Sequence, residues 1–342
     1  MRTPITRLVT RLSLTVAVVT LAIGISAAAP VEVAAQDTLH FEPTIGYPTV
    51  DVRDPVATIR PGTVLISRTN HGDYYEPGGG PFPGEVGPFW IEGATTNDIL
   101  VVEVLKVQPN HNLAGAQLYP DFGGLATDSR SRFLNDPIEA RRYEWALDTE
   151  AMTGTVDLPD SEMSSITIDL KPMLGRVSVA PANGEAFAGL WPGNFGGNMD
   201  APEIREGTTV YLPVWNDGAY FYFGDGHAAQ GEGEVNGTGL ETSMDVAFRI
   251  SLIKGETIAW PRLEDDDYIM VAGSARPLID AFRLAHVELV EWLVDEYGFG
   301  KWDAYMLVGQ LGESTVANIV DPIYTVVAKF PKKHLPESNR ER

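Results

Sequence analysis

A glycine-rich stretch at residues 223–241, FGDGHAAQGEGEVNGTGLE, carries side chains that could bind a metal ion and move a proton. Glycine disfavours regular structure, so such a stretch is either a loose surface loop or a functional site. Side chains two residues apart on a strand share a face, which places Asp225 beside His227 and, if that segment is extended, Glu232 beside Glu234. A carboxylate with an imidazole suits zinc, and further carboxylates would also serve calcium or manganese. The alternative is a glycine-rich hairpin with solvated acids.

A second pair with the same spacing lies in LWPGNFGGNMDAPEI, residues 190–204. Asp200 could bind a metal or orient a neighbouring group, and Asn198 could donate to a substrate carbonyl. The glycines before them let the backbone approach a ligand closely. The alternative is a helix N-cap, because Asp200 precedes Ala201 and Pro202 and has Glu203 three residues later, as in a capping box. Taken alone, this pattern favours the cap.

Short apolar segments punctuated by glycine and proline predict a mainly β fold, a sandwich or barrel, from about residue 40 to 260. The predicted strands lie within residues 56–69, 88–108, 164–181, 208–215, 219–226 and 243–253. The candidate metal-binding stretch therefore begins on a strand. Residues 136–147 are predicted to contain a short helix.

Beyond about residue 262 the apolar spacing changes to three and four residues, which predicts a helix. Its apolar stripe, interpreted as core packing, consists of Leu278, Phe282, Ala285, Leu289 and Leu293. A second short helix is expected after Asp303, followed by a closing strand at 323–330. The chain is thus divided into a signal peptide (1–35), a β-rich catalytic domain (36–260), a helix-containing part that completes the fold (261–333) and a flexible tail (334–342).

The N-terminus and the charge of this 342-residue chain restrict its location and partners. Arg2, Arg7 and Arg11 precede an apolar run that ends in small residues, which predicts an export signal cleaved after Ala35 and a periplasmic or extracellular protein. A net charge of −22 argues against nucleic acid and anionic membrane surfaces as partners. A neutral small molecule fits, no membrane contact is expected after cleavage, and base rates allow a homo-oligomer.

Other catalytic signatures are absent from the sequence. There is no HExxH pair, no GxSxG elbow and no cysteine. Each of the remaining histidines is individually interpreted as structural or exposed: His40, His71, His111, His286 and His334.

Several stretches in order resemble the acetamidase/formamidase family: PVATIRPGTVLIS, GPFWIEGATTNDILVVEVL, RVSVAPANGE, PGNFGGNMD, GTTVYLPVWNDGAYFYFGDGHAAQGEGEVNGTGLETS and VDPIYTVVAKFPK. The resemblance covers roughly residues 40–333. It implies hydrolysis of the C–N bond of short linear amides to ammonia and a carboxylate. It also implies a β-sandwich related to CUB-like and jelly-roll folds, an α/β C-terminal part and a divalent metal near the acids. The residues that match the family pattern are Asp200, Asp225, His227 and Glu234.

Two departures from the family pattern are Glu232, where the family usually has aspartate, and Phe195, where it commonly has histidine. The leading hypothesis is an exported amidohydrolase in which Asp200, Asp225 and His227 hold the ion. Glu232 or Glu234 would carry the proton to the leaving amine.

Two other hypotheses stay open. One is a non-catalytic protein on the same scaffold that binds a small ligand or a metal, with Phe195 and Glu232 marking lost catalysis. The other is an amidase for a larger or cyclic amide, in which Trp90, Trp191 and Phe195 form the wall of the pocket.

Overall fold

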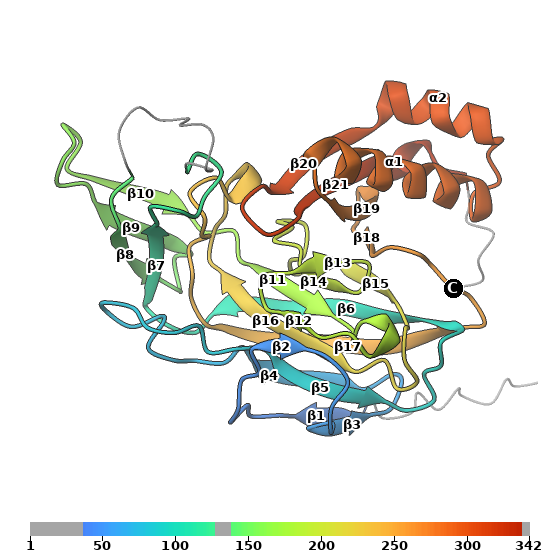
Figure 1. Cartoon of the computed structure of the whole chain (residues 1–342), viewed down its shortest axis with the longest axis horizontal. Coiled ribbons are helices and arrows are strands. Elements are labelled where there is room, and N and C mark those ends of the chain that lie inside the picture. Colours follow the sequence, from blue (N-terminus) through green and yellow to red (C-terminus); the bar gives the residue numbers. More distant parts are fainter. Residues whose placement is uncertain (1–36, 127–137, 337–342) are drawn as a thin grey trace, which may run out of the picture. The chain divides into compact units, whose positions relative to one another are not determined.

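The computed structural model describes residues 37–126 and 138–336, all of which belong to one compact unit (Figure 1). The predicted signal peptide and most of the predicted tail lie outside the described residues. Those two expectations therefore stay predictions.

The largest element of the fold is a nine-stranded sheet. Its strands, in spatial order, are β1 (Thr38–His40), β4 (Val64–Arg68), β17 (Met244–Lys254), β6 (Asp98–Pro109), β15 (Thr209–Pro213), β18 (Arg262–Glu264), β19 (Tyr268–Ala275), β21 (Tyr324–Pro331) and β20 (Glu313–Asn318). The C-terminal strands β18 to β21 thus extend the same sheet that the N-terminal strands begin. All its neighbouring pairs are antiparallel except β1 with β4.

A six-stranded sheet carries Asn198, Asp225 and His227 of the residues singled out by the sequence. Its order is β13 (Pro192–Gly193), β14 (Gly196–Asn198), β11 (Met173–Ser178), β16 (Phe221–His227), β5 (Val86–Ile91) and β3 (Ala57–Ile59). A four-stranded sheet has the order β10 (Ser165–Asp169), β9 (Thr153–Asp157), β8 (Arg141–Asp148) and β7 (Leu113–Leu118). A two-stranded sheet pairs β12 (Phe187–Ala188) with β2 (Thr49–Val50). Short 3-10 turns occupy Ala182–Gly184, Glu232–Glu234 and Lys332–His334.

The two large sheets bury one continuous hydrophobic core between them. Rings of β16 meet a ring of β17 across the interface: the ring centroids of Phe221 and Phe223 lie 5.8 and 5.1 Å from that of Phe248. Alternate residues of each strand point into this layer, as expected for packed antiparallel sheets. The predicted mainly β fold with a helix-containing C-terminal part is confirmed.

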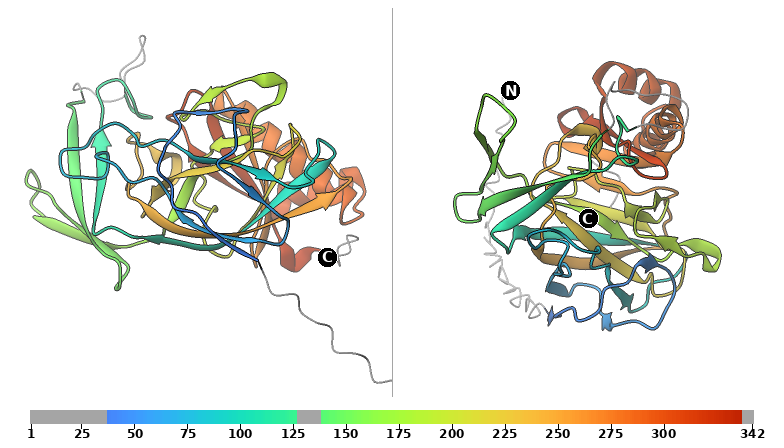
Figure 2. Two further views of the ribbon diagram at one scale, coloured as in Figure 1. Left: turned by 90° about the horizontal axis from the view of Figure 1, so that it is seen from below. Right: turned by 60° about the vertical axis from the view of Figure 1, so that its left-hand side comes forward.

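Two helices, α1 (Leu278–Asp295) and α2 (Lys301–Leu311), lie at one end of the described part, and the four-stranded sheet projects from the other end (Figures 1 and 2). Helix α1 packs closely on β19, where a Cβ on Gly273 would come within 2.7–3.0 Å of backbone atoms of Ala281 and Ala285. The predicted core stripe is correct for Ala285, Leu289 and Leu293, but Phe282 is 41% exposed. Among the described residues, no helix combines the length and apolar character needed to cross a membrane.

The helix predicted within residues 136–147 is wrong. Arg141–Asp148 forms strand β8, which pairs with β7 on one side and β9 on the other. Both partner strands form backbone hydrogen bonds with β8, which the local sequence alone does not predict. Such tertiary pairing outweighs a weak helix preference.

Asp98 fixes the start of the long strand β6. Its carboxylate, 2% exposed, accepts hydrogen bonds from Thr95 N and Oγ1 and from Gly255 N, and it pairs with Lys254. Burial opposes its ionisation, but Lys254 and Thr95 outweigh this effect and hold the pKa of Asp98 below its usual range. We expect Asp98→Ala to lower the free energy of unfolding by about 1–3 kcal/mol, measured by urea denaturation at neutral pH.

The pH dependence gives a second check on Asp98. A carboxyl whose pKa is lowered by folding stabilises the protein above its unfolded-state pKa, and this contribution disappears as the pH falls through the folded-state pKa. The difference between wild type and Asp98→Ala should therefore shrink in acid. The exposed Glu92, changed to alanine, is the control; equal unfolding free energies for the two variants would contradict this role.

Candidate active site

The folded chain brings the sequence-predicted residues Asp200, Asp225, His227 and Glu234 into one buried cluster. Asp200 follows β14, Asp225 and His227 lie on β16, and Glu234 ends the 3-10 turn after it. Strand β11 runs between β14 and β16. Its Gly175 leaves room for the carboxylates, because a Cβ there would lie 2.4 Å from Asp200 Oδ1 and 2.6 Å from Asp225 Oδ2.

The ligand atoms of this cluster form two overlapping groups that share His227. Asp200, His227 and Glu234 each offer an atom within 4.8 Å of the others, and so do Asp225, His227 and Glu241. The Nε2 atom of His227 lies 3.4 Å from Asp225 Oδ1 and 3.1 Å from Glu241 Oε1. These pairs are close contacts without the alignment of a hydrogen bond.

Three of the acids have an uncommon backbone conformation. Asp200, Asp225 and Glu234 have φ values of 44°, 59° and 49°, in the left-handed region that favours glycine. For non-glycine residues such conformations are often costly, and they concentrate at functional sites where the surrounding structure enforces them. The backbone of Asp200 also turns without starting a helix, so the alternative interpretation of this residue as an N-cap is wrong.

Gln230 fixes the orientation of the His227 ring. Its Nε2 donates to the carbonyl oxygens of Asp200 and Ala317, at 2.7 and 3.0 Å, so its Oε1 faces His227 Nδ1 at 2.8 Å. An amide oxygen only accepts, and Nδ1 therefore carries the hydrogen. This arrangement turns Nε2 of His227 toward the carboxylates, as in metal sites whose histidines are oriented by an outer partner.

Two asparagines orient Asp200 in a similar way. Asn198 Nδ2 donates to Asp200 Oδ2 and to Asp321 Oδ2, both at 2.8 Å. Asn318 Nδ2 donates to the same two oxygens at 3.2 and 3.0 Å. Asp200 Oδ1 and Asn198 Oδ1 are buried and make no hydrogen bond within the described part of the chain. The free atom of Asn198 is thus an acceptor, which differs from the predicted donor to a carbonyl.

Arg176 of β11 balances part of the negative charge. Its guanidinium lies 2.8 Å from Glu85 Oε1 and 3.6 Å from Asp225 Oδ2, and all three side chains are almost fully buried. Burial opposes ionisation of Asp225, but Arg176 and His227 prevail and hold the pKa of its carboxyl below its usual range. Asp225 is therefore ionised at neutral pH.

The remaining acids are harder to ionise. Burial raises the pKa of Glu234 to about 8, and burial also raises the pKa of Asp321 to about 7. Burial with the neighbouring Glu234 and Asp321 raises the pKa of Asp200 well above its usual value. Burial lowers the pKa of His227, but Glu241 and Asp225 reverse this and raise it well above the usual value. The cluster attracts positive charge at His227 Nε2, from a proton or a metal ion.

Glu232 and the predicted aromatic wall lie elsewhere. Glu232 is exposed, and after burial the largest influence on its pKa is Glu203. Phe195 is buried and stacks on Phe187, with ring centroids 5.0 Å apart. Trp90 packs against Tyr220. Glu232 and Phe195, which depart from the family pattern, therefore lie outside the groups of potential ligands.

A cavity of about 440 Å³ opens onto the cluster. Its polar lining includes Arg176, Asn198, Asp225, Glu234, Glu241 and Asp321. Its apolar lining includes Tyr74, Phe82, Tyr119, Phe122 and Leu190, and none of Trp90, Trp191 and Phe195 belongs to it. Asp200 and His227 lie behind the lining residues. A small molecule in this cavity would thus contact both carboxylates and aromatic rings.

Comparison with known proteins identifies the family of this chain. A sequence profile of the Acetamidase/Formamidase family matches residues 176–333. The crystal structure of acetamidase from Yersinia enterocolitica is 35% identical, with a TM-score of 0.78 over 89% of this chain and 94% of that one. The chain belongs to the acetamidase/formamidase family.

Two further relatives support the assignment to this family. The crystal structure of acetamidase from Bacillus halodurans is 26% identical, with a TM-score of 0.74 over 86% of this chain and 98% of that one. Acetamidase from Mycolicibacterium smegmatis is 26% identical over 215 residues, 49% of this chain and 53% of its own length. The chain spans about half the length of the curated relatives that it matches.

Sequence reasoning missed several residues of the site: Glu85, Arg176, Gln230, Glu241, Asn318 and Asp321. Glu241 ends the glycine-rich stretch itself, so its acidic side chain was a usable signal. Gln230 also lies in that stretch, but its neutral side chain gave no comparable signal. Glu85, Arg176, Asn318 and Asp321 come from distant segments, and only the pairing of the strands and the return of the chain at the end of β20 bring them together.

Proposed function

We propose that the chain hydrolyses the C–N bond of a primary amide to ammonia and a carboxylate. The observation that carries this proposal is the buried group of Asp200, His227 and Glu234, whose ligand atoms lie within 4.8 Å of one another and of which Glu234 lines the cavity. Asp200 Oδ1 and His227 Nε2 are both buried and make no hydrogen bond in the described residues. Family membership supports the same activity, because the matched relatives bear the names acetamidase and formamidase. The substrate carbonyl would lie against the polar side of the cavity.

A divalent metal fits these residues. Within residues 37–126 and 138–336, six buried carboxyl groups of this cluster face two buried basic side chains, Arg176 and His227; the six are Glu85, Asp200, Asp225, Glu234, Glu241 and Asp321. Carboxylate oxygens and imidazole nitrogens are both ligands that zinc takes in proteins, and catalytic zinc sites have three protein ligands. We assign Asp200, His227 and Glu234 as the ligands, because Arg176 already compensates Asp225. When bound, zinc would supply Lewis acidity to the amide carbonyl.

The side chains of the cavity would divide the remaining work. Glu241 lines the cavity. Its Oε2 atom is buried and makes no hydrogen bond within the described residues. It would take the proton from the attacking water and deliver it to the leaving nitrogen. The C–O bond forms, the C–N bond breaks, and the products are a carboxylate and ammonium. Asn198 Oδ1 would accept a hydrogen bond from the amide N–H, and Arg176 would stabilise negative charge on the carbonyl oxygen.

The aromatic side of the cavity gives a prediction about the acyl group. Acetamide occupies on the order of 100 Å³ at liquid density, well below the cavity volume of about 440 Å³. Packing a phenyl ring against Tyr74, Phe82 and Phe122 would stabilise the complex by about 1.5–3 kcal/mol. We expect kcat/KM for benzamide to exceed that for acetamide by roughly 10–100-fold, measured as ammonia release.

Phe122→Ala, which removes one aromatic ring from the cavity lining, should remove much of this preference and leave turnover of acetamide nearly unchanged. Phe195→Ala, outside the cavity lining, is the matched control and should keep the preference. A kcat/KM that falls steadily from formamide to benzamide would contradict the predicted acyl site, although amide hydrolysis itself would stand.

A further inference from the structure

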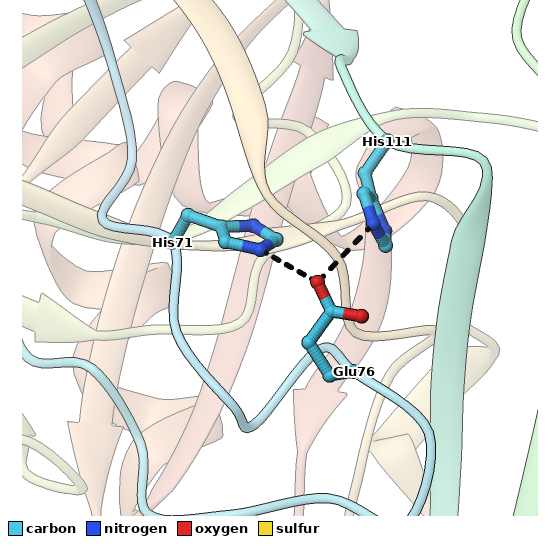
Figure 3. Close-up of side chains that lie close together, drawn as sticks. All are labelled: His71, Glu76 and His111. Carbon is cyan, nitrogen blue, oxygen red and sulfur yellow. Dashed lines mark hydrogen bonds and ion pairs between the residues drawn. The ribbon is translucent and has the colours of Figure 1, made fainter.

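A second group of potential metal ligands lies outside the candidate active site. His71 and Glu76 belong to the connection between β4 and β5, and His111 to the turn between β6 and β7 (Figure 3). Glu76 Oε1 lies 3.0 Å from His71 Nε2 and 3.6 Å from His111 Nε2. All three ligand atoms lie within 4.8 Å of one another, and none of the three residues lines the cavity.

The other nitrogen of each ring already has a fixed partner. His111 Nδ1 lies 3.2 Å from the carbonyl oxygen of Leu113, which only accepts, so Nδ1 carries a hydrogen. His71 Nδ1 lies 3.2 Å from Ser243 Oγ. Ser243 donates its own hydrogen to Asn110 Oδ1 at 2.6 Å, and therefore accepts from His71. Both histidines thus direct Nε2 toward Glu76, as Figure 3 shows.

The orientation of Asn110 is fixed as well. Its Nδ2 donates to Asp245 Oδ1 at 2.9 Å, which leaves Oδ1 for Ser243. A chain of hydrogen bonds therefore runs from Asp245 through Asn110 and Ser243 to His71. Metal-binding histidines commonly have such an outer partner, which sets the ring orientation and the tautomer.

Protons alone satisfy this arrangement poorly. Two neutral rings would point two nitrogen lone pairs at a carboxylate. Two protonated rings would place two cations beside one carboxylate, with ring centroids 5.0 Å apart. One protonated and one neutral ring would satisfy His71, whose Nε2 lies 3.0 Å from Glu76 Oε1, but would leave the lone pair of His111 Nε2 facing the same oxygen at 3.6 Å. A divalent cation between the three groups would accept both lone pairs and the carboxylate at once. Ligands bound tetrahedrally to zinc at about 2.0–2.2 Å lie about 3.3–3.6 Å apart, close to the distances observed here.

We propose that His71 Nε2, His111 Nε2 and a Glu76 carboxylate oxygen form a binding site for a divalent transition metal ion such as Zn²⁺. The side chains are 34%, 23% and 45% exposed, so the ion would be reachable from solvent and would retain at least one water ligand. The donor set of two imidazoles and one carboxylate favours zinc, cobalt or nickel over magnesium or calcium.

The ion would join two segments that are far apart in the sequence. The connection that contains His71 and Glu76 also supplies Tyr74 and Phe82 to the cavity, and the ring of Phe82 lies 4.4 Å from the guanidinium carbon of Arg176. Binding would hold this connection against the turn between β6 and β7. The site would thus hold one wall of the cavity in place without touching the substrate.

The test uses the full-length chain, from which metal is first removed with a chelator. Co²⁺ is then added as the probe. Equilibrium dialysis should give one more bound Co²⁺ per chain for wild type than for His71→Ala or His111→Ala, and the difference should appear in the visible absorption of the Co²⁺ complex. Glu76→Gln, which preserves the size of the side chain, should weaken binding at this site at least about tenfold. His40→Ala, an exposed histidine on β1, should bind as wild type does.

Circular dichroism of the metal-free proteins shows whether each variant folds. If a histidine variant does not fold, the Co²⁺ affinity of Glu76→Gln tests the site instead. Because the measurement counts bound metal, it does not depend on the candidate active site or on amidase activity. Equal Co²⁺ stoichiometry and affinity for wild type and for the folded His71, His111 and Glu76 variants would overturn the proposal.

Discussion

His227→Ala is expected to lower kcat/KM for amide hydrolysis by about 10³-fold or more. Loss of a metal ligand removes the Lewis acid from the site, and several kcal/mol of transition-state stabilisation correspond to this factor. His227 is 1% exposed and belongs to both groups of potential ligands, so no other residue of the cluster can replace it simply. Ammonia release under saturating and limiting substrate, together with zinc content, measures the effect.

The control for this prediction is His286→Ala, because His286 lies on α1 and contacts Phe282 and Ser314 away from the cavity. His227→Gln provides a second test that keeps a polar side chain, should the alanine variant not fold. A folded His227 variant with wild-type ammonia release would contradict the assigned active site. If its zinc content were also unchanged, His227 would not be a zinc ligand.

Glu241→Gln is expected to reduce kcat by about 10²–10⁴-fold while zinc content stays at the wild-type level. Glutamine keeps the size of the side chain and the acceptor for Gly239 N, which Glu241 Oε1 contacts at 3.0 Å, but it cannot accept a proton from water. Glutamate at this position is buried next to His227, so the variant removes the proton carrier without opening a cavity.

Glu232→Gln is the matched control for Glu241→Gln. It makes the same chemical change in the same glycine-rich stretch, but at an exposed side chain. We expect its kcat to stay within about twofold of wild type, since exposed substitutions usually change little. If Glu232→Gln loses activity and Glu241→Gln does not, the proton carrier proposed here is wrong and the first of the two sequence candidates is restored.

The sequence was sufficient where the signal was local. Asp225 and His227 share a face because of their two-residue spacing on a strand, and the structure places them together on β16. The mainly β fold followed from short alternating segments in the same way. The helix at α1 followed from its three- and four-residue spacing, although Phe282 lies on the exposed side.

The sequence was insufficient where distant segments decide the outcome. Asp200 looked like a helix cap because Pro202 and Glu203 follow it, but its left-handed backbone is imposed by packing against β11 and by Asn198 and Asn318. Arg176 and Asp321 carry no local motif that marks them. His71 and His111 were each unremarkable alone, and only the fold brings their Nε2 atoms to one carboxylate.

The most direct test of the central claim is ammonia release from primary amides by the purified protein before and after removal of metal and restoration with zinc. The proposal predicts release that disappears on chelation, returns with zinc and is absent from His227→Ala. A protein that binds zinc stoichiometrically yet releases no ammonia from formamide, acetamide or benzamide would contradict it and would favour a binding protein on the same scaffold.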